Sequence, residues 1–137
     1  MVKKKNVLFL CTGNSCRSQM AQGWATYLRG DEIEAFSAGV APARLSSRAV
    51  EVMSEVGVDI SRHYSKYIDD LAGIDFDLVV TVCDNAKEQC PVWHGKAKVI
   101  HHCFDDPTGA LGTIDFIMSE FRRVRDEIRD FVSSLKV

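Results

Sequence analysis

The chain has 137 residues, of which 46% are hydrophobic and 26% are charged, and its formal net charge is −2. These values are typical of one globular domain that can bury a core, so residues 1–137 are expected to form a single domain. A charge so close to zero argues against a broad nucleic-acid-binding surface. Because no stretch approaches the roughly 20 apolar residues of a membrane span and no secretory signal is apparent, we expect a cytoplasmic protein without a membrane partner.

Strand and helix patterns alternate along the chain. The predicted strands are residues 7–10, 35–38, 77–82 and 98–103. The predicted helices are residues 17–29, a helix capped by Ser46 or Ser47 and closed by Gly57, a turn at 68–71, a short helix at 84–89, and a long helix at 113–135. The stripe expected to be buried on the first helix is Met20, Trp24, Tyr27 and Leu28. The alternation predicts an α/β fold, a single three-layer domain in which a four-stranded parallel sheet is flanked by helices.

The segment between the first strand and the first helix has the composition of an oxyanion-binding loop. Backbone N–H groups that converge at a helix N-terminus bind tetrahedral oxyanions, and the same environment favours a thiolate at Cys11. The guanidinium of Arg17 can clamp two oxygens, and Ser18 can donate its hydroxyl to the thiolate. We therefore predict that Cys11 is a nucleophile. The predicted anion-binding residues are Thr12, Gly13, Asn14, Ser15, Cys16, Arg17 and Ser18.

Two further reactive positions follow predicted strands. In parallel sheets, ligands bind outside the carboxyl ends of the strands. Cys83 follows the third strand, and Asp105 and Asp106 follow the fourth. Pro107 restricts Asp106 to an extended conformation, which favours Asp106 over Asp105 as a general acid beside the loop.

Five cysteines, an odd number without a secretory signal, indicate a reducing compartment. Cys83 and Cys90 are seven residues apart, which on a straight helix places them about 10 Å apart along its axis, beyond disulfide reach. A bond between them would require the segment to bend or unwind, so that oxidised and reduced forms would differ in shape. The alternative is two unrelated buried thiols. Cys16 is either a small loop residue or a thiol that can form a protective disulfide with Cys11.

A zinc site is a competing interpretation of the second half of the chain. The donors available to it are Cys83, Cys90, His94, His101, His102 and Cys103. Their spacing disfavours it, because structural zinc sites use closely paired ligands such as Cys-x2-Cys. Neighbours on a strand also point to opposite faces, which separates His101 from His102. We therefore expect no metal site.

The chain resembles the low-molecular-weight protein tyrosine phosphatase superfamily over essentially its whole length. The resemblance rests on residues 7–18, on the Ser37-Ala38-Gly39 turn and on Asp106-Pro107. Cys83 and Cys90, together with Met20 and Trp24, resemble its thioredoxin-coupled arsenate reductase branch. Phosphatases of this fold usually carry aromatic residues after Asp-Pro to hold a phosphotyrosine ring. Here the residues that follow are Thr108, Gly109 and Ala110.

The resemblance implies a mechanism and its partners. Cys11 would attack arsenate, Asp106 would protonate the departing oxygen, and Cys83 would then attack Cys11 and release arsenite. Cys90 would move the disulfide to Cys83–Cys90, which thioredoxin would reduce. Thiols would supply both electrons, so no cofactor is expected. Phosphate and sulfate would compete with arsenate as oxyanions, and the protein would act as a monomer.

Some members of the superfamily bind potassium behind the loop through an Asn, a Glu, a Ser and an Asp. The matching residues here are Asn14, Gln22, Ser37 and Lys66. Because two carboxylates are missing, we expect no potassium site and expect the Lys66 ammonium to take the place of the ion. Two alternative functions remain at this stage. One is a phosphatase acting on tyrosine phosphate, which needs neither Cys83 nor Cys90, and the other is a non-catalytic zinc or thiol sensor.

Overall fold

The structure is a computed structural model that describes residues 3–83 and 92–137. Its elements in chain order are β1 (Lys5–Cys11), α1 (Arg17–Arg29), β2 (Ile33–Gly39), α2 (Ser47–Glu55), η1 (Ile68–Leu71), β3 (Leu78–Thr81), β4 (Lys98–His101), η2 (Pro107–Gly109) and α3 (Ile114–Ser134). The short helix predicted at 84–89 and Cys90 lie outside the described residues. Every other predicted strand and helix is present, and α1 has the predicted bounds.

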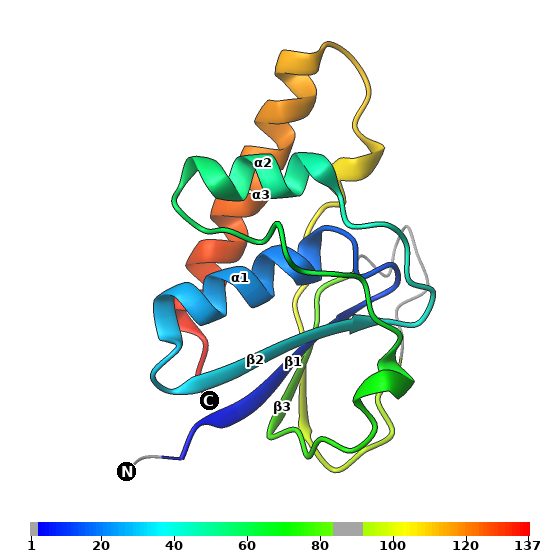
Figure 1. Ribbon diagram of the computed structural model, residues 1–137, viewed down its shortest axis with the longest axis vertical. Helices are drawn as coiled ribbons and strands as arrows, with labels where there is room; N and C mark the ends of the chain where they lie inside the picture. Colours follow the sequence, from blue (N-terminus) through cyan, green and yellow to red (C-terminus); the bar gives the residue numbers. More distant parts are fainter. Residues whose placement is uncertain (1–2, 84–91) are drawn as a thin grey trace.

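The four strands form one parallel sheet in the order β2-β1-β3-β4. Figure 1 shows β1 running between β2 and β3, with the long helix α3 extending beyond the sheet. In the register of the sheet, Leu10 of β1 pairs with Ala38 of β2 and with Thr81 of β3. Val7, Leu8, Phe9 and Leu10 are completely buried. The central strand therefore delivers Cys11 to the middle of the sheet edge where ligands bind.

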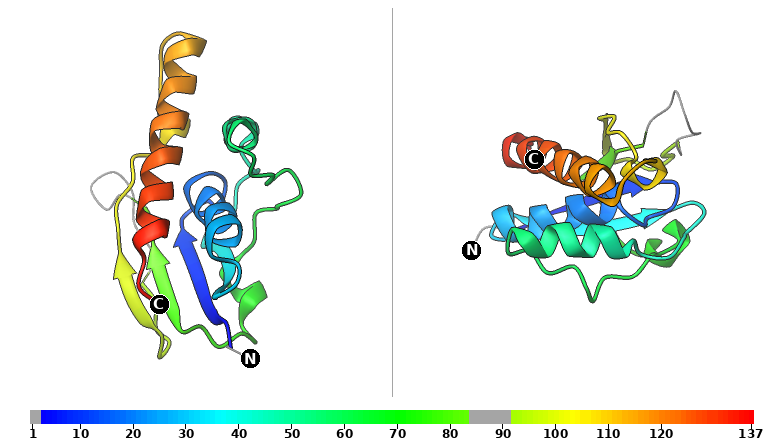
Figure 2. Two further views of the ribbon diagram at one scale, coloured as in Figure 1. Left: turned by 90° about the vertical axis from the view of Figure 1, so that its left-hand side faces the viewer. Right: turned by 90° about the horizontal axis from the view of Figure 1, so that it is seen from above.

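Helices α1 and α3 pack together on one face of the sheet, and α2 packs against α3 (Figure 2). Phe9 of β1 belongs to the core on this face, whereas Leu8 belongs to a smaller core on the opposite face. The smaller core is covered by η1 and by an aromatic group in which Phe76 makes edge contacts with Phe36 and Trp93. The predicted three-layer α/β domain is confirmed, with the short η1 covering the second face.

The buried side of α1 differs from the predicted stripe. Tyr27 and Leu28 are 59% and 40% exposed, so their prediction as core residues is wrong. The buried apolar residues of α1 are Met20, Ala21, Trp24 and Ala25. The buried side is the one that packs against α3, where the Trp24 indole N–H donates a hydrogen bond of 3.0 Å to the carbonyl oxygen of Arg125. The small alanines lie on this side of the helix and are completely buried.

Strand β4 ends at His101, two residues earlier than predicted. His102 instead packs its ring against Phe104 and Phe131, with centroid distances of 4.7 and 4.4 Å. The part of the chain that the structure describes contains no group of three or more His, Cys, Asp or Glu residues that could hold a metal ion. Nor does it contain a helix with the length and hydropathy needed to cross a bilayer.

Candidate active site

The loop between β1 and α1 places Cys11 against two hydrogen-bond partners. Cys11 is the last residue of β1, and its side chain is 97% buried, since only 3% of the residue is exposed. The backbone N–H of Asn14 donates to Cys11 Sγ at 3.2 Å, and Ser18 Oγ lies 3.0 Å from the same sulfur. When Cys11 is a thiolate, it can only accept, so Ser18 is then the donor. The predicted Ser18 contact is therefore present.

The close packing of the loop explains a glycine on the neighbouring strand. A Cβ atom on Gly39 would lie 2.4 Å from the carbonyl oxygen of Thr12 and 3.0 Å from the backbone nitrogen of Asn14. Only glycine lets the end of β2 approach the loop so closely. Gly39 belongs to the turn that carries the family resemblance, but its role in packing could not be predicted because the contact joins residues that are distant in the chain.

Arg17 begins α1 and connects the loop to the segment after β4. Its residue is only 5% exposed, and Nη1 donates to the carbonyl oxygen of Phe104 at 3.1 Å. Nη2 lies 3.6 Å from Asp106 Oδ2 in an ion pair. The guanidinium is thus held in a fixed orientation by a backbone oxygen 87 residues further along the chain, a contact that no local sequence pattern predicts. The structure brings Arg17 and Asp106 together at the same edge of the sheet.

The two neighbouring aspartates point in different directions. Asp106 precedes Pro107 in an extended conformation, and its Oδ1 accepts hydrogen bonds from Thr108 N (3.0 Å) and Thr108 Oγ1 (2.6 Å). Asp105 instead forms an ion pair of 3.0 Å with Arg123 of α3. The geometry therefore favours Asp106 over Asp105 as the carboxyl group that faces the loop.

Cys16 differs chemically from Cys11, although both lie in the same loop. Its side chain is buried, and burial raises the pKa of the Cys16 thiol far above its usual range, with the negative charge of Asp106 raising it further. Cys16 therefore stays protonated at neutral pH and is a poor nucleophile. Cys11, Cys16 and Cys103 are thiols that form no disulfide.

Cys83 lies two residues after β3, the strand that pairs with the strand of Cys11. Leu10 pairs with Thr81 across β1 and β3, and the N–H of Val82 continues the ladder by donating to the carbonyl oxygen of Leu10 at 3.1 Å. Cys11 and Cys83 therefore leave the same edge of the sheet on adjacent strands. Cys83 is completely buried and is disulfide-bonded. Cys90, its predicted relay partner, lies outside the described residues.

The residues matched to a potassium site form contacts among themselves. Ser37 Oγ donates to Gln22 Oε1, and the backbone N–H of Lys66 donates to Asn14 Oδ1 at 2.9 Å. The Lys66 ammonium donates to the carbonyl oxygen of Tyr64 at 2.9 Å and lies 4.6 Å from the centre of the Tyr64 ring. Burial lowers the pKa of Lys66. The backbone of Lys66, and not its ammonium, makes the contact to Asn14; the absence of a potassium site stays a prediction.

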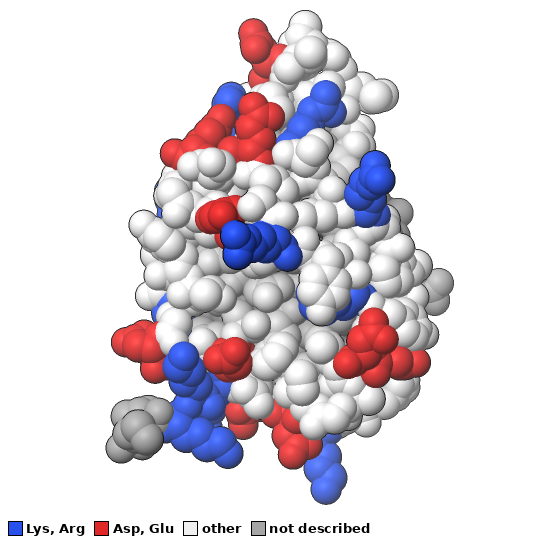
Figure 3. Space-filling model, viewed as in Figure 1, with Lys and Arg blue, Asp and Glu red and all other residues white. Residues whose placement is uncertain are grey.

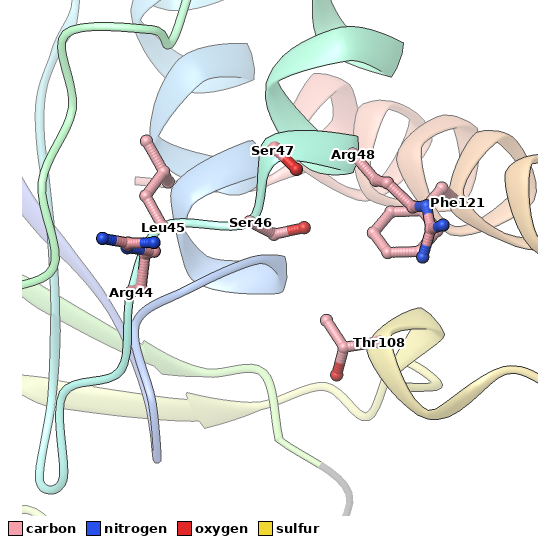
Figure 4. A pocket seen from close by; sticks show the side chains of 7 residues that line it. All are labelled: Arg44, Leu45, Ser46, Ser47, Arg48, Thr108 and Phe121. Carbon is pink, nitrogen blue, oxygen red and sulfur yellow. The ribbon is translucent and has the colours of Figure 1, made fainter.

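A cavity of about 550 Å³ lies between the beginning of α2, η2 and α3 (Figure 4). It is lined by Arg44, Leu45, Ser46, Ser47, Arg48, Thr108 and Phe121. The backbone N–H of Ser46 donates to the carbonyl oxygen of Ser15 at 2.9 Å, and Thr108 bonds to Asp106 as described above. The cavity therefore adjoins both the loop and the candidate general acid. Its volume exceeds that of a tetrahedral oxyanion, and its lining includes two arginines.

Charges outside the site show no dominant sign on the face seen in Figure 3, where acidic and basic side chains are interspersed. An anion is therefore attracted by the local field of the loop and Arg17.

Residues 6–136 match the family described as low molecular weight phosphotyrosine protein phosphatase. The chain belongs to this family. Within it, "Arsenate reductase 2" of Staphylococcus epidermidis is 46% identical over 133 residues, which are 97% of each chain. The arsenate reductase of Bacillus subtilis is 48% identical over 127 residues, which are 93% of this chain and 91% of the relative.

Solved structures of the same family share the fold. An arsenate reductase in its oxidised state superposes with a TM-score of 0.79 at 32% identity, covering 96% of this chain and 95% of the other. A thioredoxin-dependent arsenate reductase from Corynebacterium glutamicum gives a TM-score of 0.64 at 27% identity, covering 94% of this chain and 62% of the other. A low molecular weight protein tyrosine phosphatase from T. tengcongensis gives 0.71 at 32% identity, covering 94% and 95%. The resemblance to arsenate reductases of this family is confirmed.

Proposed function

We propose that this protein reduces arsenate to arsenite by a thiol–disulfide relay. The observation that carries the proposal is the placement of Cys83 two residues after β3, the strand that pairs with β1, at the same edge of the sheet as the oxyanion loop. A phosphatase of this family needs only the loop, the arginine and the general acid. A second cysteine beside the nucleophile gives the site a source of electrons, and the relatives of highest identity named above are arsenate reductases.

The first step forms a bond between Cys11 and arsenic. The Cys11 thiolate attacks arsenate held by the loop N–H groups and Arg17, and one arsenate oxygen leaves as water. Asp106 supplies a proton to that oxygen, because its carboxyl group lies 3.6 Å from the Arg17 guanidinium that holds the oxyanion. Arsenic remains in the pentavalent state in this adduct.

The second step carries the reduction. The Cys83 thiolate attacks Cys11 Sγ, the sulfur–arsenic bond breaks, and its electron pair stays on arsenic. Arsenic becomes trivalent and leaves as arsenite, while Cys11 and Cys83 are oxidised to a disulfide. The attack requires two sulfurs within reach of each other, and the pairing of β1 with β3 supports this requirement because both cysteines stand at the ends of these strands.

Two exchange steps regenerate the protein. Cys90 attacks Cys83, the Cys11 thiolate leaves, and the disulfide moves to Cys83–Cys90. Reduced thioredoxin then supplies two electrons, so the cycle uses no metal or flavin. We propose thioredoxin as the partner because the C. glutamicum neighbour is a thioredoxin-dependent arsenate reductase. We further propose that the protein acts as a monomer in the cytoplasm, where thiols are kept reduced.

Hydrolysis of phosphate esters is a second candidate activity. The cavity beside the loop, with Arg44, Arg48 and Phe121 in its lining, provides space for the leaving group of a phosphomonoester. The residue after Asp106-Pro107 is Thr108, which donates hydrogen bonds to Asp106 and offers no aromatic ring to hold phosphotyrosine. We therefore propose phosphatase activity as a weak side reaction.

The deciding experiment measures arsenate-dependent NADPH oxidation in the presence of thioredoxin and thioredoxin reductase. We expect turnover by the wild-type protein and none by Cys11→Ser, because the serine hydroxyl is not ionised at this site. Hydrolysis of p-nitrophenyl phosphate is measured on the same samples. Aryl phosphate hydrolysis without arsenate turnover would reject the reductase and leave the phosphatase.

A further inference from the structure

Asn14 contacts both the nucleophile and its hydroxyl partner. Its backbone N–H donates to Cys11 Sγ, and its side-chain Nδ2 donates to Ser18 Oγ at 2.9 Å. It is completely buried, and its φ of 49° lies in the left-handed region, which asparagine adopts more readily than other residues with a side chain. Both the backbone oxygen and the side-chain oxygen of Asn14 accept hydrogen bonds from other segments, and these contacts hold its position.

Gln19, two residues into α1, supplies much of that enforcement. Its side-chain Nε2 lies 3.0 Å from the Asn14 carbonyl oxygen, 3.0 Å from Asn14 Oδ1 and 3.0 Å from the carbonyl oxygen of Tyr64. Gln19 is itself completely buried. One amide group thus connects both the backbone and the side chain of Asn14 to the backbone of Tyr64.

These contacts fix the orientation of the Gln19 amide. Asn14 Oδ1 also accepts the N–H of Lys66, so it is an acceptor, and the other two partners of Nε2 are carbonyl oxygens. The nitrogen of Gln19 must therefore face these three oxygens, and Oε1 must face the other way.

Gln19 Oε1 lies 3.0 Å from His63 Nδ1. Because an amide oxygen can only accept, Nδ1 of His63 has to carry the hydrogen. Burial lowers the pKa of His63, and the nearby positive charge of Lys66 lowers it further, against an opposing effect of Asp59. The neutral form with hydrogen on Nδ1 satisfies both the hydrogen bond and the surroundings.

We propose that Gln19 is a positioning residue for the nucleophile, oriented by the Nδ1–H of His63 and acting through Asn14 on Cys11. The chain of contacts runs from His63 to Gln19, from Gln19 to Asn14, and from Asn14 to the sulfur of Cys11 and the hydroxyl of Ser18. This inference rests on the proposed role of Cys11 as nucleophile, and it is independent of which oxyanion is the substrate.

The test compares two glutamines one turn apart on α1. Gln19→Met removes the amide with little change in size, and Gln22→Met makes the same change where the side chain accepts only from Ser37. The readouts are the rate of alkylation of Cys11 by iodoacetamide, located by mass mapping, and kcat and KM for p-nitrophenyl phosphate. We expect Gln19→Met to lower the alkylation rate and kcat by about tenfold, since a displaced donor weakens stabilisation of the reacting group. Gln22→Met should stay near wild type in both.

Variants of His63 separate positioning from packing. His63→Leu removes the donor to Gln19 and should slow alkylation, whereas His63→Asn restores an N–H donor and should recover a large part of the rate. The ¹⁵N shifts of the His63 ring in the wild-type protein should report hydrogen on Nδ1 at neutral pH. If Gln19→Met does not fold, this measurement and the His63 variants still test the positioning role of Gln19.

The outcomes distinguish this inference from the proposed function. Wild-type alkylation at Cys11 with an unchanged rate in Gln19→Met would overturn the inference alone, as would a His63 ring with hydrogen on Nε2 only. Absence of any reaction at Cys11 in the wild-type protein would overturn both the role of Cys11 and the inference.

Discussion

At the scale of single residues, the site depends on groups that are oriented by the backbone of a distant segment. Arg17 donates to the carbonyl oxygen of Phe104, and it faces Asp106 two residues further along. The anion clamp and the candidate proton donor are thus positioned by the same loop after β4. A change in either side chain tests a specific contact with the oxyanion.

Arg17→Lys should severely impair arsenate turnover. A lysine ammonium is a point charge that cannot hold two oxygens in the plane of a guanidinium, and it cannot also reach the Phe104 carbonyl. We expect a loss of about 2–4 kcal/mol in transition-state stabilisation, as for removal of an oxyanion donor. The check is kcat/KM for arsenate, and a value within about threefold of wild type would contradict the clamp.

Asp106→Asn and Asp105→Asn form a matched pair, because the two residues are adjacent and differ in what they face. Loss of a general acid typically slows a reaction by about 10²–10⁴-fold, so Asp106→Asn should be strongly impaired. Asp105 only pairs with Arg123 on the surface, and its substitution should have little effect. Single-turnover rates with arsenate measure the comparison. The opposite ranking would assign the proton to Asp105.

At the scale of elements, the ends of three parallel strands define the site. β1 carries Cys11, β3 leads to Cys83, and β2 ends in Gly39 against the loop. The loop therefore depends on the register of the sheet as well as on its own sequence.

Gly39→Ala should disturb the loop through a backbone clash that no side-chain rotation can relieve. The added methyl group would lie 2.4 Å from the Thr12 carbonyl oxygen. We expect the free energy of unfolding to fall by about 1–3 kcal/mol, in the range of overpacked sites, together with weaker phosphate binding. Gly73→Ala is the control, because a Cβ there meets nothing within 4 Å. Urea unfolding and phosphate titration give the two measurements, and equal behaviour of the two variants would refute this role of Gly39.

Elements with a strong local pattern could be predicted from sequence. The strand before Cys11, the helix over residues 17–29 and the loop residues between them have the predicted places. Contacts between distant segments could not be predicted. The outward position of Tyr27 depends on where α3 crosses α1, and the contacts of Gln19 depend on residues 63–66. Nothing in the local pattern around Gln19 distinguishes it from a solvated helix residue.

At the scale of the whole molecule, the three relay cysteines should divide the reaction into stages that can be trapped. Cys83→Ser and Cys90→Ser should each stop multiple-turnover arsenate reduction with thioredoxin, because the thiols supply the electrons. Both should retain hydrolysis of p-nitrophenyl phosphate, which ends with water attacking the Cys11 adduct.

The trapped species should differ between the two variants. After one equivalent of arsenate, Cys90→Ser should accumulate a Cys11–Cys83 disulfide, whereas Cys83→Ser should form none; mass mapping identifies the bond. Cys103→Ser is the control and should be nearly silent, because Cys103 is exposed and has no assigned step. Normal arsenate turnover in both relay variants would reject the relay.

The central position of β1 also affects local unfolding of the protein. Val7, Leu8, Phe9 and Leu10 are paired with strands on both sides and completely buried, so their amide hydrogens should exchange with solvent only when the whole domain unfolds. Cys11 is the last residue of this slowly exchanging strand. The reactive sulfur is therefore protected from local fraying of the strand. A reagent should reach it only through the opening of the loop. Selectivity toward small anions would then follow as much from the rigidity of the strand as from the charges around the loop.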